Sequence, residues 1–563
     1  MPLAAEQILE ALDEQQREAA MSLHGPTLIL AGAGTGKTRT ITHRIAYGIA
    51  LGDFTENRIL ALTYTNRAAG ELRARLRALD AGSVNVKTFH AAALAQVDYF
   101  WQQFYSMNAP RVIESKANLI SKAGEALKLR LDANTVRDLA AEIEWRKCNM
   151  LSLDEYADLI STRPPLSTLS SSVALSVQQK YEDLKISAGQ VDWEDVLILT
   201  LGMLRAEPRA LNHVQQQYRF FTVDEYQDIS KLQQELLDVW LGDHSDICAV
   251  GDPNQTIYTF AGATSEFMHS FSSRYLDANV VELTKNYRSV EPIILAANKV
   301  VAQNQTMAAL ESVRGGGASL KIENFETQDL EAKAIAASIG GLLIGGAKAS
   351  QIAVLYRINS QSEALENALS AAGIEYQVRG GQRFFNRQEV TGAVRLVRAE
   401  AMTNPTRAAF ESMSAVARSL GWQAMPGDLQ GPAREKWDAL NALVDIADEL
   451  GADATVAQLA TELDERARSQ HEPQREAVTL STVHAAKGLE WQNVYVFSAN
   501  EGYMPISYAT KPEQLAEEQR LFYVAITRAK DSLWLSWSKR ETSDSQRERS
   551  ASRFLQLISP EFS

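Results

Sequence analysis

The sequence predicts an α/β protein in which helices cover parallel sheets. Three observations lead to this fold class: short apolar segments recur along the chain, stretches with helical spacing separate them, and a glycine-rich loop follows the first segment. Parallel strands need crossover connections, usually helices, so this alternation favours parallel sheets. At 563 residues the chain exceeds one hydrophobic core and should contain several domains. The predicted strands are residues 27–30, 59–63, 220–223, 247–250, 352–356, 478–482 and 493–497.

The glycine-rich loop, AGAGTGKT from Ala31 to Thr38, lies between a predicted strand and a predicted helix. In this arrangement the backbone N–H groups of the loop and the helix N-terminus face phosphate oxygens. Lys37 would reach the outer phosphates and Thr38 would hold a magnesium ion. The loop starts with Ala31 where the pattern has glycine, and kinases, GTPases and motors share such loops. Taken alone, it leaves all three classes open.

A second motif, VDEYQD, runs from Val223 to Asp228 directly after a predicted strand. This position puts Asp224 at a strand tip beside the metal, with Glu225 next to it to orient an attacking water. The plain structural interpretation is that Glu225 is a solvated carboxylate at a strand end. Together the two motifs predict a magnesium-nucleotide site with hydrolytic chemistry.

Composition limits the classes of function. The formal charge of −14 and the pI near 5.3 argue at first against a nucleic-acid partner, because phosphate neutralisation needs lysine and arginine. The objection is partial, since a local basic groove with stacking surfaces is enough for a protein that follows a single strand. Cys148 and Cys248 have no metal-ligand spacing and cannot form a disulfide framework, which fits a reducing compartment. With no membrane-length apolar run and no signal-peptide order at the start, we expect a cytoplasmic protein.

Six further strings accompany the two motifs. They are TYTNRAA (63–69), TFH (88–90), GDPNQTIYTF (251–260), NYRS (286–289), TVHAAKGLEW (482–491) and YVAITRAK (523–530). In this order the strings resemble the motif series of the UvrD/PcrA/Rep helicases of superfamily 1, over nearly the whole chain. The resemblance is specific, because all of the strings would have to be accidental. It implies two RecA-like, parallel-sheet P-loop domains, each with a helical insertion.

The resemblance also implies a domain division. Residues 1–91 and 191–282 would form the ATP-binding RecA-like domain 1A, with residues 92–190 as helical insertion 1B. Residues 283–390 and 477–563 would form RecA-like domain 2A, with residues 391–476 as insertion 2B. That second insertion is about half the length usual in the family, and no glycine-centred, duplex-contacting string is found in it.

The family's nucleotide site maps onto this chain residue by residue. Arg288 and Arg528 resemble two arginines that reach the γ-phosphate from domain 2A, which would couple the nucleotide state to domain closure. Gln255 resembles the glutamine that senses the γ-phosphate. The implied catalytic residues are Lys37, Asp224, Glu225, Gln255, Arg288 and Arg528, and the implied metal ligands are Thr38 and Asp224. The implied nucleotide contacts are Gln16, Ala31, Gly32, Ala33, Gly34, Thr35, Gly36, Lys37, Thr38, Arg39, Tyr287, Arg288 and Glu490.

Some of these positions have plain structural alternatives or depart from the family. Gln16, expected to read the adenine edge, could be a surface residue of an amphipathic helix, and Tyr287, expected to stack on adenine, could be a packing residue. Asp13 stands where the family usually has asparagine. Ala261 stands where the family usually has arginine, so coupling between ATP and DNA here uses another route or is weaker.

Single strands are held by stacking and backbone contacts, and the resemblance supplies candidates for both. Aromatic residues in such strings are often core residues, and His90 and His484 could simply satisfy backbone carbonyls. The implied DNA-binding residues are Thr63, Tyr64, Thr88, Phe89, His90, Tyr258, Phe260, Arg357, Asn359, His484 and Lys487.

Three hypotheses of function remain. The first is an ATP-dependent 3′–5′ DNA helicase and single-strand translocase of repair or replication maintenance, with ATP and Mg²⁺ as cofactors. Its partners would be single-stranded DNA, junctions of single and double strands, and repair or single-strand-binding proteins, with no membrane. The second is a translocase that removes bound proteins with little unwinding, and the third is a nucleotide-switched binding protein without a motor cycle.

Overall fold

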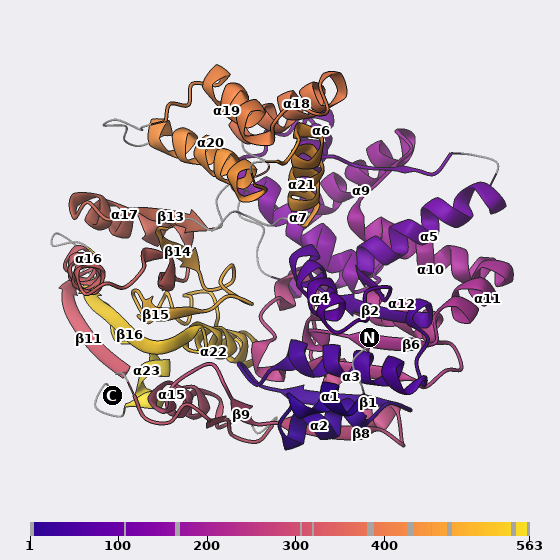
Figure 1. Cartoon of the computed structure of the whole chain (residues 1–563), viewed down its shortest axis with the longest axis horizontal. Coiled ribbons are helices and arrows are strands. Elements are labelled where there is room, and N and C mark those ends of the chain that lie inside the picture. Colours follow the sequence, from indigo (N-terminus) through magenta and orange to yellow (C-terminus); the bar gives the residue numbers. More distant parts are fainter. Residues whose placement is uncertain are drawn as a thin grey trace. The chain divides into compact units, whose positions relative to one another are not determined.

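The computed structural model describes residues 5–105, 108–163, 169–304, 307–317, 320–379, 385, 388–424, 432–451, 453–469, 476–541 and 548–559. The chain forms two compact units (Figure 1). The first unit comprises residues 1–294, 301–315 and 512–523, and the second comprises residues 295–300, 316–511 and 524–563.

The first unit is built on a six-stranded sheet with the strand order β3-β2-β6-β7-β1-β8, and every neighbouring pair is parallel. Because parallel strands point the same way, the segments that follow β1, β2, β6 and β7 all leave from one edge of the sheet. These segments hold the glycine-rich loop, Tyr64, Asp224 and Asp252. The bounds are β1 (Thr27–Ala31), β2 (Ile59–Thr63), β3 (Asn85–Thr88), β6 (Phe220–Val223), β7 (Ile247–Gly251) and β8 (Asn279–Leu283).

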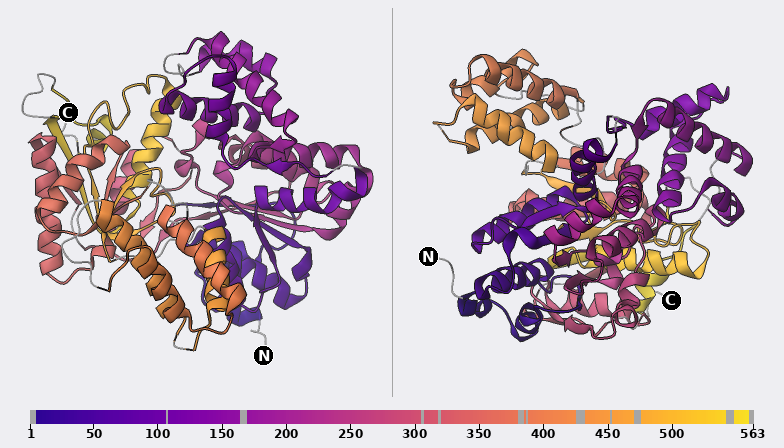
Figure 2. Two further views of the ribbon diagram at one scale, coloured as in Figure 1. Left: turned by 90° about the horizontal axis from the view of Figure 1, so that it is seen from above. Right: turned by 90° about the vertical axis from the view of Figure 1, so that its right-hand side faces the viewer.

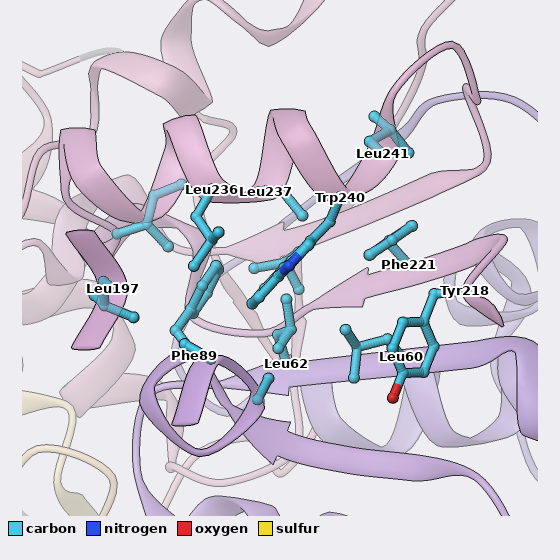
Figure 3. Close-up of a cluster of buried hydrophobic side chains, with 14 of the residues drawn as sticks. Leu60, Leu62, Phe89, Leu197, Tyr218, Phe221, Leu236, Leu237, Trp240 and Leu241 are labelled. Atoms are coloured by element: carbon cyan, nitrogen blue, oxygen red, sulfur yellow. The ribbon is translucent and has the colours of Figure 1, made fainter. Parts of the chain in front are cut away.

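Helices cover both faces of this sheet. Neighbouring residues of a strand point to opposite faces, so Ile29 packs in one hydrophobic cluster and Leu28 in the other. Figure 3 shows the second cluster, with Trp240 at its centre beside Phe89 and Phe221. The covering helices are α3 (Lys37–Leu51), α4 (Asn66–Ala78), α5 (Phe89–Phe104), α10 (Trp193–Ala206) and α12 (Lys231–Leu241).

The first unit has further elements outside these layers. A short parallel pair and a group of helices lie between α5 and α10 in the sequence, where the first helical insertion is predicted. These are β4 (Arg111–Val112), α6 (Lys116–Ala126), α7 (Ala133–Cys148), α8 (Leu153–Leu159), α9 (Ser171–Ser187) and β5 (Gln190–Val191). The remaining elements are α1 (Ala5–Glu10), α2 (Glu14–Met21), α11 (Pro208–Gln217), α13 (Glu266–His269), α14 (Phe271–Arg274), β9 (Lys285–Asn286), α15 (Glu291–Val301), which continues into the second unit, and β10 (Glu311–Ser312).

A buried ion cluster joins α7 and α9 to the start of α10. Lys147 Nζ lies 2.6 Å from Asp192 Oδ2, and Lys185 Nζ lies 3.1 Å from the same oxygen. Burial opposes ionisation of Asp192, but the two ammonium groups hold the pKa of its carboxyl well below the usual range. Removing one member would leave an uncompensated buried charge, so the cluster fixes where these helices meet.

The second unit also has a six-stranded parallel sheet, with the order β11-β16-β15-β12-β14-β13. Its strands are β11 (Leu320–Thr327), β12 (Ile352–Tyr356), β13 (Tyr376–Arg379), β14 (Val478–Thr482), β15 (Trp491–Val496) and β16 (Ala529–Arg540). The helices that adjoin these strands in the sequence are α16 (Gln328–Ile344), α17 (Ser362–Ala371), α22 (Pro512–Ile526), which begins in the first unit, and α23 (Arg553–Ile558).

Four more helices of the second unit pack around their own hydrophobic core (orange in Figure 2). Val397, Met413, Leu443 and Leu459 are buried in it, one from each helix. The helices are α18 (Gln388–Thr403), α19 (Ala409–Ser419), α20 (Pro432–Glu449) and α21 (Val456–Ser469).

The predicted fold class is confirmed: two parallel α/β sheets form the two units, and helical insertions accompany them. All seven predicted strands are present, with ends shifted by one or two residues in β1, β7 and β15. Five strands of the two six-stranded sheets were missed, namely β3, β8, β11, β13 and β16. Four of them are edge strands, where one side meets solvent and polar residues interrupt the apolar run, as in LKIENFET of β11. β16 alternates polar and apolar residues over much of its length.

Glu331 of α16 is a buried carboxylate beside the second sheet. Its Oε1 accepts hydrogen bonds from Ser498 N at 2.7 Å and from Ser536 Oγ at 2.5 Å. Burial raises the pKa of Glu331 to about 7, although these donors favour the charged form. A raised folded-state pKa means that the stabilising contribution is complete below pH 4.5 and is lost as the pH rises toward 7.

Replacement of Glu331 by glutamine should therefore become more favourable to stability as the pH increases. The difference in unfolding free energy between wild type and Glu331→Gln should shift by about 3 kcal/mol in favour of the variant between pH 4.5 and 8. Melting midpoints of both proteins at pH 5 and pH 8 measure this shift. Asp329→Asn, at an exposed position on the same helix, is the control. A shift equal to that of the control would contradict the assignment.

Candidate active site and nucleic-acid interface

The glycine-rich loop connects β1 to α3 and has a backbone that requires glycine. Gly34 has φ 72° and Gly36 has φ 86°, in the left-handed region that residues with a Cβ avoid. A Cβ at Gly34 would also lie 2.5 Å from Asn286 Nδ2 and 2.7 Å from Arg288 Cβ. The loop is thus fixed by its own conformation and by the NYRS string packed against it.

Lys37 is the first residue of α3, and its ammonium group points back over the loop. Lys37 Nζ donates to the carbonyl of Ala31 at 2.9 Å and to that of Gly32 at 3.4 Å. Thr35 Oγ1 donates to the Gly32 carbonyl at 2.9 Å. These bonds turn carbonyls inward toward Lys37, and the helix N-terminus adds its positive dipole end, so the loop is suited to bind phosphate.

Asp224 follows β6 and is buried at the edge of the sheet. Its Oδ1 accepts no hydrogen bond from the described residues. Burial and then the neighbouring charge of Glu225 raise the pKa of Asp224 to about 7, while Lys37 acts in the opposite direction.

A buried carboxylate oxygen without a donor among the described residues and the hydroxyl of Thr38, the second residue of α3, are hard oxygen ligands of the kind that Mg²⁺ prefers. Among the described residues no group of three or more His, Cys, Asp and Glu could hold a metal. Mg²⁺ usually binds through one or two carboxylates and completes its shell with phosphate and water.

Glu225 is held by a network that reaches the GDPNQ string. It has φ 54°, a left-handed conformation that is rare without glycine. Gln227 Nε2 donates to Glu225 Oε2, and Gln227 Oε1 accepts from Asp252 N at 3.0 Å. Asp252 Oδ2 in turn accepts from Gln255 Nε2 at 2.8 Å. The residues predicted to orient water and to sense the γ-phosphate are therefore linked through two buried side chains.

Asn286 fixes the NYRS string to the loop. Its Nδ2 donates to the Ala33 carbonyl at 2.5 Å, and its Oδ1 accepts from Arg288 N at 3.0 Å and Ser289 N at 2.7 Å. Tyr287 N also donates to the Gly34 carbonyl at 2.9 Å. These contacts hold the NYRS string against the loop, and residues 286–289 belong to the first compact unit.

The residues predicted to contact adenine gather beside the loop. Gln16 is 3% exposed and its Nε2 donates to the Thr35 carbonyl at 2.9 Å, so it is not the surface residue of the alternative interpretation. The Tyr287 hydroxyl donates to the Asp13 carboxylate, and 42% of its ring surface remains exposed. Partial burial and then this bond raise the pKa of Tyr287 to about 12. The Arg39 guanidinium donates to the Ala11 carbonyl.

Two predicted nucleotide residues, Arg528 and Glu490, belong to the second unit. Arg528 donates from Nε to the Val524 carbonyl at 3.0 Å and from a terminal nitrogen to the Leu489 carbonyl at 3.1 Å. Glu490 is exposed and lies 2.7 Å from Lys530 Nζ. The structure thus brings together the first unit's nucleotide residues and, separately, this second set.

Predicted stacking residues cluster on the first unit. Tyr64 and Tyr258 stack with ring centroids 5.5 Å apart and planes 11° apart, and Phe260 meets Tyr258 edge-on at 6.2 Å. Phe260 is 51% exposed. His90 lies edge-on to Trp193 at 6.0 Å, and burial, followed by the charge of Lys116, lowers its pKa to about 4. His90 is neutral at pH 7 and cannot act as a cation toward phosphate.

Phe89, one of the predicted DNA-binding residues, lies in the core of the first unit. Phe89 is 3% exposed and stacks on Trp240 in the core with centroids 6.0 Å apart, so its ring is not available to a base. The Thr88 hydroxyl accepts a hydrogen bond from Ala91 N at 3.1 Å and caps α5. Thr63 is buried, with an Oγ1 that has no hydrogen-bond partner among the described residues.

The predicted DNA-binding residues of the second unit lie at the ends of β12 and β14. Burial, then the charges of Arg357 and Lys487, lower the pKa of His484 to about 3. Asn359 is exposed near Arg357. The group combines two cations with a neutral imidazole, a combination suited to backbone phosphates.

Most of the chain matches two known protein families. The model of the UvrD/REP helicase N-terminal domain matches residues 12–276, and that of the UvrD-like helicase C-terminal domain matches residues 281–426 and 407–540. The chain is 40% identical over 584 residues to ATP-dependent DNA helicase UvrD2 of Mycobacterium tuberculosis, with 100% of this chain and 83% of the relative covered. The chain belongs to the UvrD/Rep helicase family.

Two other relatives of this UvrD/Rep family member are also named ATP-dependent DNA helicases. It is 29% identical over 643 residues to ATP-dependent DNA helicase UvrD1 of M. tuberculosis, covering 95% of this chain and 83% of the relative. It is 29% identical over 653 residues to ATP-dependent DNA helicase PcrA of Leuconostoc citreum, covering 99% and 86%. The predicted family and the predicted enzyme class, an ATP-hydrolysing helicase, are confirmed. No helix among the described residues is both long and apolar enough to cross a membrane.

Three residues of this UvrD/Rep family member were missed by the sequence reasoning. Gln227, Asp252 and Asn286 join the motifs to one another through the hydrogen bonds described above. All three stand inside strings that were recognised, within three residues of an assigned residue. Their polar amide or carboxyl groups next to buried strand ends were the available signal.

Proposed function

We propose that the chain is an ATP-dependent 3′–5′ DNA helicase and single-strand translocase that acts in DNA repair or replication maintenance. The observation that carries the proposal is the continuity of residues 251–260. One end of this segment holds Gln255 in the network with Glu225, and the other end presents Tyr258 and Phe260. A change at the nucleotide would reach the aromatic pair without passing through another element.

The catalytic roles follow from the positions of the side chains. The loop with Lys37 binds phosphate, Glu225 orients the attacking water, and Arg288 adds positive charge from the clamped NYRS string. Thr38 and Asp224 would hold Mg²⁺, which when bound stabilises the negative charge that develops on the transferred phosphoryl group. Gln16, Tyr287 and Glu490 would select the nucleoside, while Arg528 would contribute from the second unit.

The DNA track would use stacking and phosphate contacts. Tyr64, Tyr258 and Phe260 are offered as stacking residues of the first unit, and Arg357 with Lys487 as phosphate contacts of the second. Thr63, Thr88 and His90 would contribute beside the first group, and Asn359 and His484 beside the second. The relatives named above are called DNA helicases, which supports DNA as the nucleic acid.

Phe260→Ala should weaken binding of a single-stranded oligonucleotide about tenfold, because stacking of one base is worth about 1–3 kcal/mol. Fluorescence anisotropy of a labelled oligothymidylate measures the dissociation constant. Phe410→Ala removes a ring of similar exposure from α19 and is the control. Equal affinities of the Phe260→Ala and Phe410→Ala variants for the oligonucleotide would mean that Phe260 does not stack on a base.

The domain division, location and partners are also part of the proposal. We place RecA-like domains at residues 1–91 with 191–282 and at 283–390 with 477–563, and insertions at 92–190 and 391–476. The two cysteines are unpaired, in keeping with a reducing cytoplasm. Junctions of single and double strands are the expected substrates, and repair or single-strand-binding proteins the expected partners.

A second candidate function is a translocase that strips proteins from single strands and unwinds little. The small second insertion, four described helices around one core, and Ala261 in place of an arginine favour it. Strand separation of a tailed duplex by substoichiometric enzyme would exclude this candidate.

The first experiment measures ATP turnover with and without single-stranded DNA, followed by separation of 3′-tailed, 5′-tailed and blunt duplexes in the same buffer. We expect strong stimulation and opening of the 3′-tailed substrate only. Stimulation without opening of any duplex would favour the translocase. Turnover that is slow with and without DNA would favour the third hypothesis, a nucleotide-switched binding protein.

A further inference from the structure

Helix α22 carries a row of polar side chains that hold residues 252–260. Glu517, Arg520 and Tyr523 are spaced three residues apart, so they share one face of the helix. Residues 512–523 of α22 belong to the first compact unit, as do residues 252–260. None of the three was assigned a role by the motif series.

The three side chains bind the segment at three separate points. The Glu517 carboxylate accepts hydrogen bonds from Thr259 N at 3.1 Å and from the Thr259 hydroxyl. Arg520 Nε donates to the Thr256 carbonyl at 2.8 Å. The Tyr523 hydroxyl donates to Asp252 Oδ2 at 3.3 Å. Both ends of the segment and its middle are therefore attached to one rigid helix.

Each attachment point is next to a residue with a proposed role. Asp252 Oδ2 also accepts from Gln255, and Asp252 N donates to Gln227, so the Tyr523 contact enters the nucleotide network. Thr259 stands between Tyr258 and Phe260, so the Glu517 contact sets where the aromatic pair lies. The two contacts are at opposite ends of the segment that would connect nucleotide and DNA.

We propose that Glu517, Arg520 and Tyr523 are positioning residues that transmit single-strand binding to ATP turnover by holding residues 252–260 as one body. This role rests on the proposed function, and the three residues would couple single-strand binding to ATP turnover within it. Because position 261 is alanine, the arginine that would connect the two sites in the family is absent here. The α22 face offers the alternative connection, through charge-assisted bonds that depend on geometry.

Glu517→Ala and Tyr523→Phe test the proposal in the full chain. ATP turnover is measured with and without oligothymidylate, and the ratio of the two rates is the readout. We expect this ratio to fall about tenfold in Glu517→Ala, the size expected for losing hydrogen bonds to a charged group, and less in Tyr523→Phe. Glu513→Ala, an exposed glutamate one turn earlier in α22, is the matched control and should keep the wild-type ratio.

A double variant separates positioning from general loss of structure. If the Thr259–Glu517 bond is responsible, Thr259→Val should lower the ratio on its own, and Thr259→Val with Glu517→Ala should be no worse than Glu517→Ala alone. The proposal is wrong if Glu517→Ala keeps the wild-type ratio, which includes the case in which its rates with and without oligothymidylate fall in equal proportion. A wild-type chain whose turnover is not stimulated by DNA would instead overturn the proposed function, and this inference with it.

Discussion

Replacement of Glu225 by glutamine should lower ATP turnover by about a thousandfold while ATP and single-stranded DNA still bind, as expected when a water-orienting base is lost. The side chain extends from a left-handed residue at the tip of β6, where Gln227 Nε2 bonds to one of its carboxylate oxygens. Glutamine has the same size and can keep that acceptor through its amide oxygen. The change therefore removes charge and basicity with little change in shape.

Steady-state phosphate release measures the loss, and equilibrium binding of a fluorescent ATP analogue and of an oligonucleotide checks that both sites persist. Glu235→Gln, on α12 of the same unit and paired with Arg205 at the surface, is the matched control and should turn over as the wild type does. Turnover of Glu225→Gln within about tenfold of the wild type would assign Glu225 to the plain interpretation, a carboxylate at a strand end.

Much of the site was predictable because parallel strands deliver their following residues to one edge. The loop after β1 and Asp224 after β6 follow strands that were expected from apolar runs, so their meeting followed from topology. The clamp by Asn286 was not predictable. Nothing in the spacing of NYRS indicates that an amide reaches the Ala33 carbonyl, because that contact depends on how β8 pairs with β1.

The burial of Phe89 was not predictable for a similar reason. In TFH the order of residues shows an aromatic ring near a predicted DNA contact but not the direction of that ring. Thr88 caps α5, which makes Phe89 the first residue of the helix and turns its ring toward Trp240. The direction is set by the phase of a helix, which the order of residues in TFH does not show.

Arg288 belongs to the same compact unit as the glycine-rich loop. The backbone bond from Tyr287 to Gly34 and the Asn286 clamp keep this stretch beside the loop. Of the two arginines, Arg528 alone is carried by the second unit.

Lys37→Ala should have the other large effect, lowering turnover by about a thousandfold and weakening ATP binding, because the ammonium group is the charge that the loop supplies to the phosphates. The nearby Arg39 donates to the Ala11 carbonyl and does not replace it. Lys231→Ala is the control: Lys231 is also the first residue of a helix in this unit but is exposed. Turnover close to that of the control would mean that Lys37 does not serve the nucleotide.

The same variant should change the pH dependence of magnesium binding, and the direction follows from the structure. The charge of Lys37 lowers the pKa of Asp224, which burial and Glu225 raise to about 7. Without Lys37 the pKa of Asp224 rises further, so its carboxylate is protonated at neutral pH and a higher pH is needed to bind Mg²⁺. Titration of Mg²⁺-dependent nucleotide-analogue binding between pH 6 and 9 should show a midpoint that moves upward in Lys37→Ala and stays in place in Lys231→Ala. An unchanged midpoint would mean either that Asp224 does not bind the ion or that Lys37 does not influence the ionisation of Asp224. The variant Asp224→Asn distinguishes these two explanations. It should abolish the pH dependence only if Asp224 is the ligand.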